Sequence, residues 1–225
     1  MSAAPRQLAL ALDHAENLAR EDFLSGPSNA AALALVDSWP AWPHRTVVLT
    51  GPEGSGKSHL AAIWSQAAGA RLIAARALEE DAVPAALATG ALVVEDIGAG
   101  KFDERALFHL INLAREEDAF VLLTARSAPA HFAIRDLGSR FNALPVVAIA
   151  PPEDALLRAV LVKLFADRQL AIDESLIGYL VVRIERSFAA ARAVVARLDD
   201  EAMRRRRPLT RALAADVLGA MGNRG

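Results

Sequence analysis

The sequence predicts an α/β fold, in which helices cover both faces of a parallel sheet and a small all-α part follows. Three observations predict it. Short apolar runs alternate with helical stretches up to about residue 150, these runs are continuously apolar, and only helical periodicity remains after Pro151-Pro152. Strands that alternate with helices favour a doubly wound parallel sheet, and continuously apolar strands are typical of a sheet buried on both faces.

The apolar runs predict a parallel five-stranded sheet. The expected strands are residues 46–50, 71–74, 92–94, 120–124 and 145–149. The helices expected with them are residues 27–38, 57–68, 103–117 and 135–142, with Ser25 or Ser28 near the start of the first. The later helices are expected at residues 153–168, 174–184, 187–203 and 210–221, with Asp173 and Thr210 as caps of the second and last. We therefore divide the chain into a segment of residues 1–20, an α/β domain of residues 21–150 and a helical domain of residues 151–225.

Composition excludes several classes of protein. The chain has 225 residues, of which 53% are hydrophobic and 23% charged, so it can bury a sizeable core. It has no cysteine, which excludes disulfides and thiolate metal sites. The net charge of -2 argues against strong direct DNA binding, and we interpret the run Arg204–Arg207 as a solvated helix end rather than a binding patch. No apolar run approaches the roughly 18 residues of a membrane span, so we expect a soluble cytoplasmic protein with no membrane partner.

A glycine-rich motif joins the first strand to the helix at residues 57–68. It fills every position of the G-x-x-x-x-G-K-[ST] pattern: Gly51-Pro52-Glu53-Gly54-Ser55-Gly56-Lys57-Ser58. Its glycines let backbone N–H groups point at phosphate oxygens, and the following helix, with His59 in its first turn, adds its positive end. In such a P-loop Lys57 reaches the β- and γ-phosphates and Ser58 holds Mg²⁺. Phosphate binding is therefore the function that the sequence predicts most directly.

An acidic pair, Glu95-Asp96, directly follows the expected strand of residues 92–94. A P-loop site needs one carboxylate to support Mg²⁺, here Glu95, and one to polarise the attacking water, here Asp96. The commoner order is Asp followed by Glu, and this chain reverses it. Because errors near 1 Å can cost about 10²-fold in rate, the reversal favours nucleotide binding without fast hydrolysis.

Two further positions leave alternatives open. Thr124, with Arg126 two residues later, ends a predicted central strand. It could contact the terminal phosphate or its water, or be an ordinary strand-end residue. Arg140, on a short helix before the last strand, could be a surface charge or could act in the site of a neighbouring subunit.

These motifs together resemble the AAA+ ATPase family, in particular the clade of the bacterial replication initiator DnaA, over residues 20–222. Asp22-Phe23-Leu24-Ser25-Gly26 resembles the stretch that lies against the adenine base, which implies a base-binding role for Phe23 and Leu24. Glu95-Asp96-Ile97 resembles the acidic motif of the clade, and Leu123-Thr124-Ala125-Arg126 its first sensor. The resemblance implies ADP or ATP with Mg²⁺ as cofactors, and Glu95, Asp96 and Thr124 as catalytic residues.

The resemblance continues toward the C-terminus. Leu137-Gly138-Ser139-Arg140-Phe141 is similar to an arginine-finger box, which implies that Arg140 is a finger. Ala150-Pro151-Pro152-Glu153 resembles the start of a helical lid. The lid arginine that serves as second sensor is replaced by Ala189, with Arg186 and Arg192 three residues away on either side. Either arginine could therefore face the nucleotide.

The first residues and the end of the sequence point to a regulatory member of the clade. Gln7-Leu8-Ala9-Leu10-Ala11-Leu12 resembles a sliding-clamp-binding peptide, in which Gln7 enters a polar pocket and Leu8, Leu10 and Leu12 fill an apolar groove, although an apolar helix start has the same pattern. The sequence stops where the initiator would continue into a helix-turn-helix domain. The resemblance implies a regulator with weak or no ATPase of its own that, with the clamp, promotes hydrolysis of DnaA-bound ATP, and that could form homo-oligomers.

Two other functions remain possible from the sequence. A helicase-loader-type AAA+ ATPase would carry a basic or aromatic loop facing single-stranded DNA, which the sequence does not show, and a single-strand binding assay would test it. A small-molecule P-loop kinase would have its lid inserted within the sheet, whereas here the helical part follows the sheet. A phosphotransfer screen would test that function.

Overall fold

A parallel five-stranded sheet forms the centre of the computed structural model, which describes residues 18–98, 100–129, 131–205 and 207–222. The predicted clamp-binding residues Gln7, Leu8, Leu10 and Leu12 lie outside the described residues. The strands are β1 (Thr46–Thr50), β2 (Arg71–Ala74), β3 (Ala91–Ile97), β4 (Phe120–Ala125) and β5 (Val146–Ala148). They pair in the order β2-β3-β4-β1-β5, every pair parallel, which confirms the predicted sheet.

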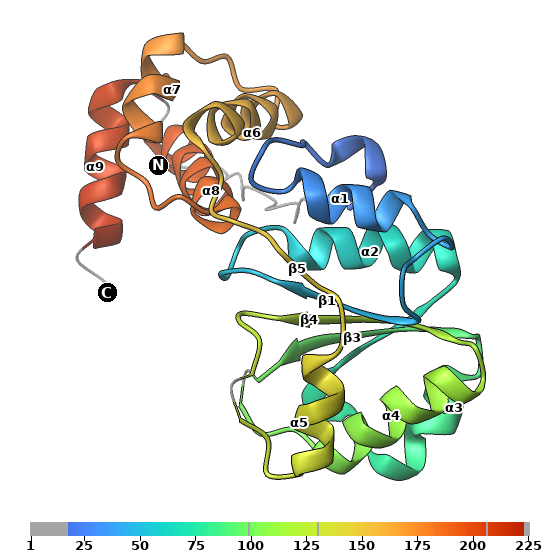
Figure 1. Ribbon diagram of the computed structural model, residues 1–225. Helices are drawn as coiled ribbons and strands as arrows, with labels where there is room; N and C mark the ends of the chain where they lie inside the picture. The colour runs from blue at the N-terminus through green and yellow to red at the C-terminus, as the bar shows by residue number, and fades with distance from the viewer. Residues whose placement is uncertain (1–17, 99, 130, 206, 223–225) are drawn as a thin grey trace, which may run out of the picture.

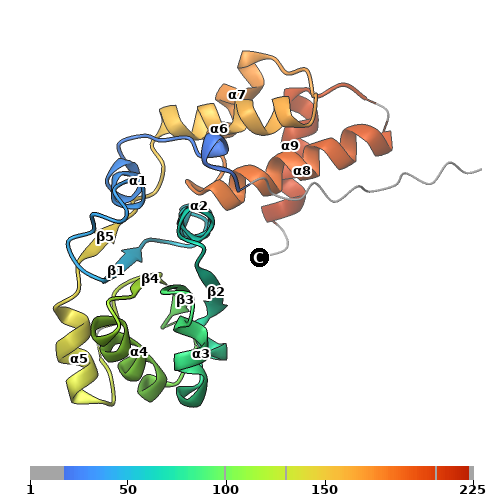
Figure 2. The ribbon, with the colours of Figure 1, turned by 90° about the vertical axis from the view of Figure 1, so that its right-hand side faces the viewer.

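Helices cover both faces of this sheet (Figures 1 and 2). One face carries α1 (Ala30–Asp37) and α2 (Lys57–Ala68). The opposite face carries α3 (Val83–Leu87), α4 (Glu104–Glu116) and α5 (Arg135–Asn142). Three short 3₁₀ helices complete this part: η1 (Arg20–Asp22), η2 (Ala75–Ala77) and η3 (Glu80–Ala82).

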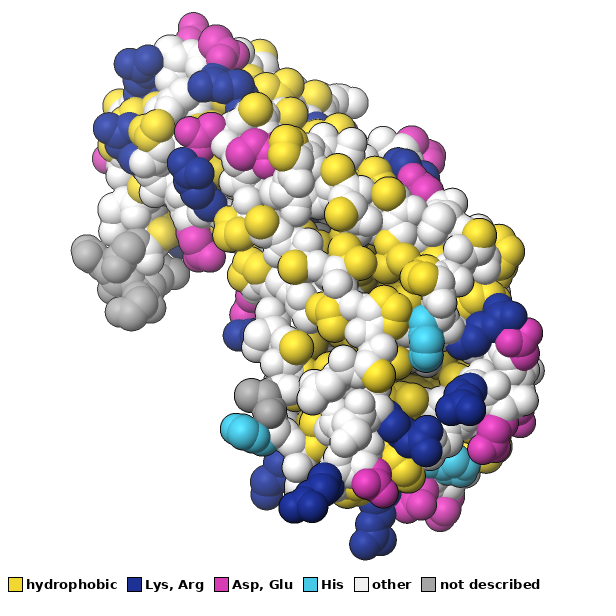
Figure 3. All heavy atoms as spheres, in the orientation of Figure 1, with side chains coloured by type: hydrophobic (Ala, Val, Ile, Leu, Met, Phe, Trp, Pro, Cys, Tyr) yellow, Lys and Arg dark blue, Asp and Glu magenta, His cyan; other side chains and the backbone are white. Residues whose placement is uncertain are grey.

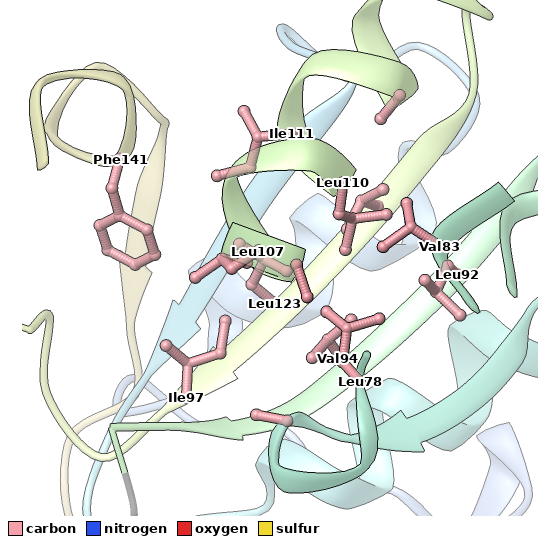
Figure 4. Packing of buried hydrophobic residues seen from close by; sticks show 14 of the residues in the cluster. Leu78, Val83, Leu92, Val94, Ile97, Leu107, Leu110, Ile111, Leu123 and Phe141 are labelled. Atoms are coloured by element: carbon pink, nitrogen blue, oxygen red, sulfur yellow. The ribbon is translucent and has the colours of Figure 1, made fainter. Parts of the chain in front are cut away.

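The strands are continuously apolar because successive side chains enter two different cores. Val48 and Leu123 point into the core beneath α3, α4 and α5, part of which Figure 4 shows. Leu49 and Leu122, one residue away in each strand, belong to the core beneath α1 and α2. Side chains alternate along a strand, so a strand buried on both faces needs an apolar residue at every position.

Helix α1 begins two residues after Ser28, which was expected near its start, and Asn29 is the N-cap. Its buried side chain accepts a hydrogen bond from Gly26 N at 2.8 Å and donates one to Leu24 O at 3.1 Å, so it fixes the turn before the helix. Helix α3 was not expected, because its 5 residues are too few to show a helical period.

Four helices form the C-terminal region (Figure 1): α6 (Asp154–Asp167), α7 (Glu174–Val181), α8 (Phe188–Arg205) and α9 (Arg211–Gly222). They share a core of their own, which includes Leu161 and Phe165. Both predicted caps are confirmed, since the side chain of Asp173 accepts from Ser175 N and that of Thr210 from Leu213 N. Helix α7 ends at Val181 rather than near residue 184.

Two arginines of the basic run, Arg204 and Arg205, form ion pairs with acidic side chains. Arg204 and Arg205 both pair with Glu201, and Arg205 also pairs with Asp216 at 2.9 Å. On the face shown in Figure 3, basic and acidic side chains are interspersed. These contacts favour a helix end over a nucleic-acid patch. Within the described ranges, no helix is both long and apolar enough to cross a bilayer.

The core beneath α1 and α2 generates a stability prediction. Leu122 is 0% exposed in the central strand β4, so Leu122→Ala should leave a cavity and lower the free energy of unfolding by about 2–5 kcal/mol. Leu72, which is 45% exposed on the edge strand β2, serves as the matched control, and Leu72→Ala should cost less than about 1 kcal/mol. Urea denaturation of both variants measures the difference. Equal losses would contradict the described packing.

Candidate phosphate-binding site

The glycine-rich loop of residues 51–56 leaves the sheet at the carboxyl end of β1. Its position is fixed by the neighbouring strand: Gly51 N donates hydrogen bonds to Ala125 O and to Arg126 O, each at 3.2 Å. Thr50, the last residue of β1, lies opposite Ala125 of β4 and Ala148 of β5. The loop therefore lies at the edge of the sheet where the parallel strands end, beside the end of β4.

The loop curls because glycines adopt conformations that other residues disfavour. Gly54 and Gly56 have φ of 70° and 99°, in the left-handed region. Helix α2 follows at once, and the N–H groups of its first turn have no earlier carbonyl to bind, since the ladder begins with Leu60 N donating to Gly56 O. Free amide donors at the positive end of a helix attract anions.

Two buried side chains of this loop suit an anion. Lys57 is 7% exposed, and its Nζ donates to Gly51 O and Pro52 O, both at 2.8 Å. Its burial lowers the pKa of Lys57 from its usual value, although the carboxylate of Asp96 opposes this shift. The hydroxyl of Ser55 is buried without a hydrogen-bond partner. A buried ammonium held by carbonyl oxygens and an unpaired hydroxyl would both gain from phosphate oxygens, so these residues fit a phosphate group.

A magnesium ion also fits the residues at the loop, provided that phosphate supplies ligands. Ser58 is exposed at the start of α2, and Glu95 is half-buried near the end of β3. The described ranges contain no group of three or more His, Cys, Asp or Glu side chains that could hold a metal by themselves. Mg²⁺ usually takes one or two carboxylates together with substrate phosphates, so Ser58 and Glu95 are suitable partners.

The structure places the backbone of Asp96 beside the side chain of Thr124, where β3 and β4 end. The pairing of β3 with β4 shifts register between Val94 and Ile97, and Asp96 has φ of 62° there. Asp96 N donates to the buried Thr124 Oγ1 at 3.1 Å, which holds the bulge in place. The side chain of Asp96 is exposed at this bulge, while that of Glu95 is half-buried. The two carboxylates therefore occupy different environments.

A cavity of about 360 Å³ lies between the N-terminal segment, the loop end and helix α6. The two predicted base-binding residues, Phe23 and Leu24, line it together with His59 of the first turn of α2. The His59 ring stands edge-on to Phe23, with centroids 5.1 Å apart, and its Nε2 lies 3.1 Å from Ala19 O. Gly56 also lines the cavity, which therefore adjoins the phosphate-binding loop. An apolar recess with polar groups next to such a loop could hold the base and sugar of a nucleotide.

The two lid arginines lie in different places. Arg192 of α8 lines the cavity. Arg186, which is 60% exposed, pairs with Asp154 Oδ1 at 2.8 Å and is not among the cavity residues. Ala189 stands where the second sensor was expected and packs against Gly54 of the loop. A Cβ atom added to Gly54 would lie only 2.6 Å from the Cβ of Ala189. Of the two arginines, the structure therefore brings Arg192 to the cavity.

Arg140 lies on an exposed part of α5. Its guanidinium carbon is 5.3 Å from the centroid of the Phe108 ring, a cation–π contact with α4. Helix α5, which carries Arg140, and helix α2, which begins at Lys57, lie on opposite faces of the sheet (Figure 1).

Sequence reasoning missed the wall that α6 contributes to the cavity. Its residues are spaced as one helical face: Val160, Lys163, Leu164, Asp167 and Arg168. Only Val160 and Leu164 on this face are apolar, so the sequence carried no amphipathic pattern that could have marked it. Lys163 also pairs with Asp22 Oδ1 at 2.6 Å, which ties α6 to the N-terminal segment and raises the pKa of Lys163.

Comparisons with known proteins agree with this architecture. No family model matches the chain, and no curated protein matches it. Domain III of the Thermotoga maritima replication initiation protein DnaA matches with a TM-score of 0.75 and 17% identity, over 92% of this chain and 97% of that one. The RuvB Holliday junction branch migration motor of Thermotoga maritima matches with a TM-score of 0.70 and 17% identity, over 90% of this chain and 71% of that one.

A nucleotide-bound structure is also similar. AMPPCP-bound DnaA from Aquifex aeolicus matches with a TM-score of 0.63 and 17% identity, over 80% of this chain and 64% of that one, so this chain spans less than two thirds of that protein. At these identities the likeness establishes the fold. The chain shares the fold of these DnaA and RuvB structures, with a parallel five-stranded sheet and a C-terminal helical region.

Proposed function

We propose that this chain is an adenine-nucleotide-binding regulator of replication initiation, resembling Hda, the regulatory inactivator of DnaA. In this proposal the residues 21–150 and 151–225 hold ADP or ATP between them. Residues 1–20 dock on the sliding clamp, and Arg140 promotes hydrolysis of ATP bound to DnaA. The observation that carries the proposal is an exposed Arg140, on a helix that resembles an arginine-finger box, in a molecule whose own acidic pair is reversed.

Nucleotide binding is supported by the buried Ser55 and Lys57. These two residues flank Gly56, which lines the same cavity as Phe23 and His59. Lys57 would bind the phosphates, and the first amides of α2 would neutralise their charge. Ser58 and Glu95 would hold Mg²⁺, which neutralises developing charge on the phosphates. Arg192 would contact the nucleotide from the helical region, and the AMPPCP in the similar Aquifex DnaA structure favours an adenine nucleotide.

Weak intrinsic hydrolysis is supported by the bulge in β3. A general base must reach the water that it activates, and Asp96 has a shorter side chain than the Glu usually found there. The exposed side chain of Asp96 and its left-handed backbone conformation also differ from what a positioned general base requires. Thr124, whose hydroxyl accepts from Asp96 N, would still position the water or terminal phosphate. We therefore propose that the site retains its nucleotide and turns it over slowly.

The Lys57 ammonium generates the first prediction. Lys57→Met should lower ADP affinity about 10- to 100-fold, because a charge-assisted hydrogen bond contributes about 1.5–3 kcal/mol. The fold should survive, since burial lowers the pKa of Lys57 and an uncharged side chain of similar length avoids that desolvation cost. Calorimetric titration with ADP, together with thermal unfolding of the same samples, measures both effects. Unchanged ADP affinity would contradict the phosphate site.

The exposed finger generates the second prediction. An arginine finger contributes about 10³–10⁵ in rate, so Arg140→Ala should abolish the stimulation of DnaA-bound ATP hydrolysis in the presence of clamp and DNA. Arg135, which is also exposed and begins the same helix, gives a matched control, and Arg135→Ala should leave stimulation near the parent level. Release of phosphate from preloaded DnaA is the measurement. If Arg140→Ala stimulates as well as the parent, Arg140 is not the finger.

The N-terminal peptide generates the third prediction. Deleting residues 1–12 should abolish capture by immobilised sliding clamp and leave ADP affinity unchanged, because the peptide precedes the segment that lines the cavity. Replacing Leu8 and Leu10 by alanine should weaken capture as the deletion does, whereas Ala9→Ser should not. Full capture of the deleted protein would show that the clamp contacts another part of the chain or none.

A further inference from the structure

An ion pair spans the mouth of the phosphate-binding loop. Arg126 Nη2 lies 2.7 Å from Glu53 Oε2. Glu53 belongs to the loop itself, and Arg126 follows strand β4. Both side chains reach into solvent, with 61% of Arg126 and 74% of Glu53 exposed. An exposed pair of this kind contributes only about 0–1 kcal/mol, so little free energy holds these two groups together.

The backbone fixes Arg126 beside the loop even when its side chain moves. The carbonyl of Arg126 accepts a hydrogen bond from Gly51 N at 3.2 Å, at the start of the loop. Arg126 is also two residues beyond Thr124, whose hydroxyl binds the backbone of Asp96. It therefore lies between the residues that bind phosphate and those assigned to the hydrolysis step.

The charged groups at this edge act on Lys57 in opposite directions. The Arg126 guanidinium is close enough to Lys57 to lower the pKa of Lys57, while the carboxylates of Asp96, Glu53 and Glu95 raise it. Burial has the largest effect on this lysine. Two cations placed together at this loop would both gain from a polyanionic ligand.

The position along the loop indicates which phosphate Arg126 would meet. The cavity that suits the base and sugar adjoins Gly56, at the far end of the loop. Gly51 and Glu53 lie at the beginning of the loop, next to the end of β4. A nucleotide whose base fills the cavity would extend its phosphates from Gly56 toward that beginning, where the last phosphate would lie nearest to Arg126.

We propose that Arg126 is a phosphate-binding residue that exchanges Glu53 for the terminal phosphate of bound ATP, and that Glu53 competes with this phosphate. The inference rests on the nucleotide binding proposed above and adds a residue that discriminates ATP from ADP within the same molecule. A guanidinium binds phosphate through paired hydrogen bonds that are stronger than an exposed carboxylate contact. Glu53 repels the added negative charge, so the pair as a whole limits the preference for ATP over ADP.

The two partners should change nucleotide affinity in opposite directions. Arg126→Ala should lower ATP affinity about tenfold and change ADP affinity less than about twofold, because only ATP carries the phosphate that Arg126 meets. Glu53→Gln should raise ATP affinity about threefold at low salt, because it removes a repelling charge close to the site. Arg115→Ala is the matched control and should change neither affinity, since α4 ends one residue later at the opposite edge of the sheet.

Calorimetric titration with ATP and ADP in the presence of Mg²⁺ measures these affinities, with the nucleotide analysed afterwards to show that ATP was intact. If the parent protein binds neither nucleotide, the proposed function and this inference both fail. If the parent binds both but Arg126→Ala weakens ATP and ADP equally, or weakens neither, the role of Arg126 is wrong and the proposed function stands. The opposite sign expected for Glu53→Gln separates phosphate competition from a general loss of loop structure.

Discussion

The two hydrogen bonds from Gly51 N to the carbonyls of Ala125 and Arg126 join the phosphate-binding loop to the end of β4. Every charged group of the site depends on this junction. It holds the loop, which leads directly into Lys57, next to the end of β4. Thr124 of β4 in turn accepts a hydrogen bond from the backbone of Asp96. Because all the strands run parallel, their carboxyl ends meet at one edge, and ligands of open α/β sheets bind at that edge.

The helical region is joined to the same loop by direct contacts. Phe188 N, at the start of α8, donates to Gly54 O at 2.9 Å. The ion pair between Asp22 and Lys163 connects α6 to the N-terminal segment on the other side of the cavity. A ligand in this cavity touches both parts of the chain, so its binding free energy can favour one arrangement of the helical region over others. This is the physical basis for treating the bound nucleotide as a structural ligand in the proposed regulator.

The sheet could be predicted from sequence because its strands are buried on both faces and so leave continuous apolar runs, as at residues 46–50. The phosphate-binding loop could be predicted because its chemistry requires particular residue types at fixed spacing. The cap Asn29 was missed because its side chain bonds backward to the turn rather than forward to the helix. The conformation of Asp96 could not be predicted either, because a register shift between two strands produces it.

Contacts between distant segments were the other part that sequence could not supply. Arg186 and Arg192 were equivalent by spacing, and the structure separates them because Arg186 pairs with Asp154 at the start of α6. The pairing of Glu53 with Arg126 depends on the strand register that places Thr50 beside Ala125. Motifs therefore indicated a candidate site, whereas the positions of individual arginines became distinguishable only once the elements were packed.

The arrangement separates holding a nucleotide from hydrolysing it. Lys57 is buried and its Nζ is held by Gly51 O and Pro52 O, so phosphate binding would need little reorganisation of this side chain. By contrast, the groups that would act on the terminal phosphate, Asp96, Glu53 and Arg126, are all exposed to solvent. Electrostatic catalysis requires charges that are fixed before the reaction, because reorienting them costs free energy at the transition state. A site with this division favours long occupancy over fast turnover, and in the proposed function the partner of Arg140 supplies the ATP that is hydrolysed.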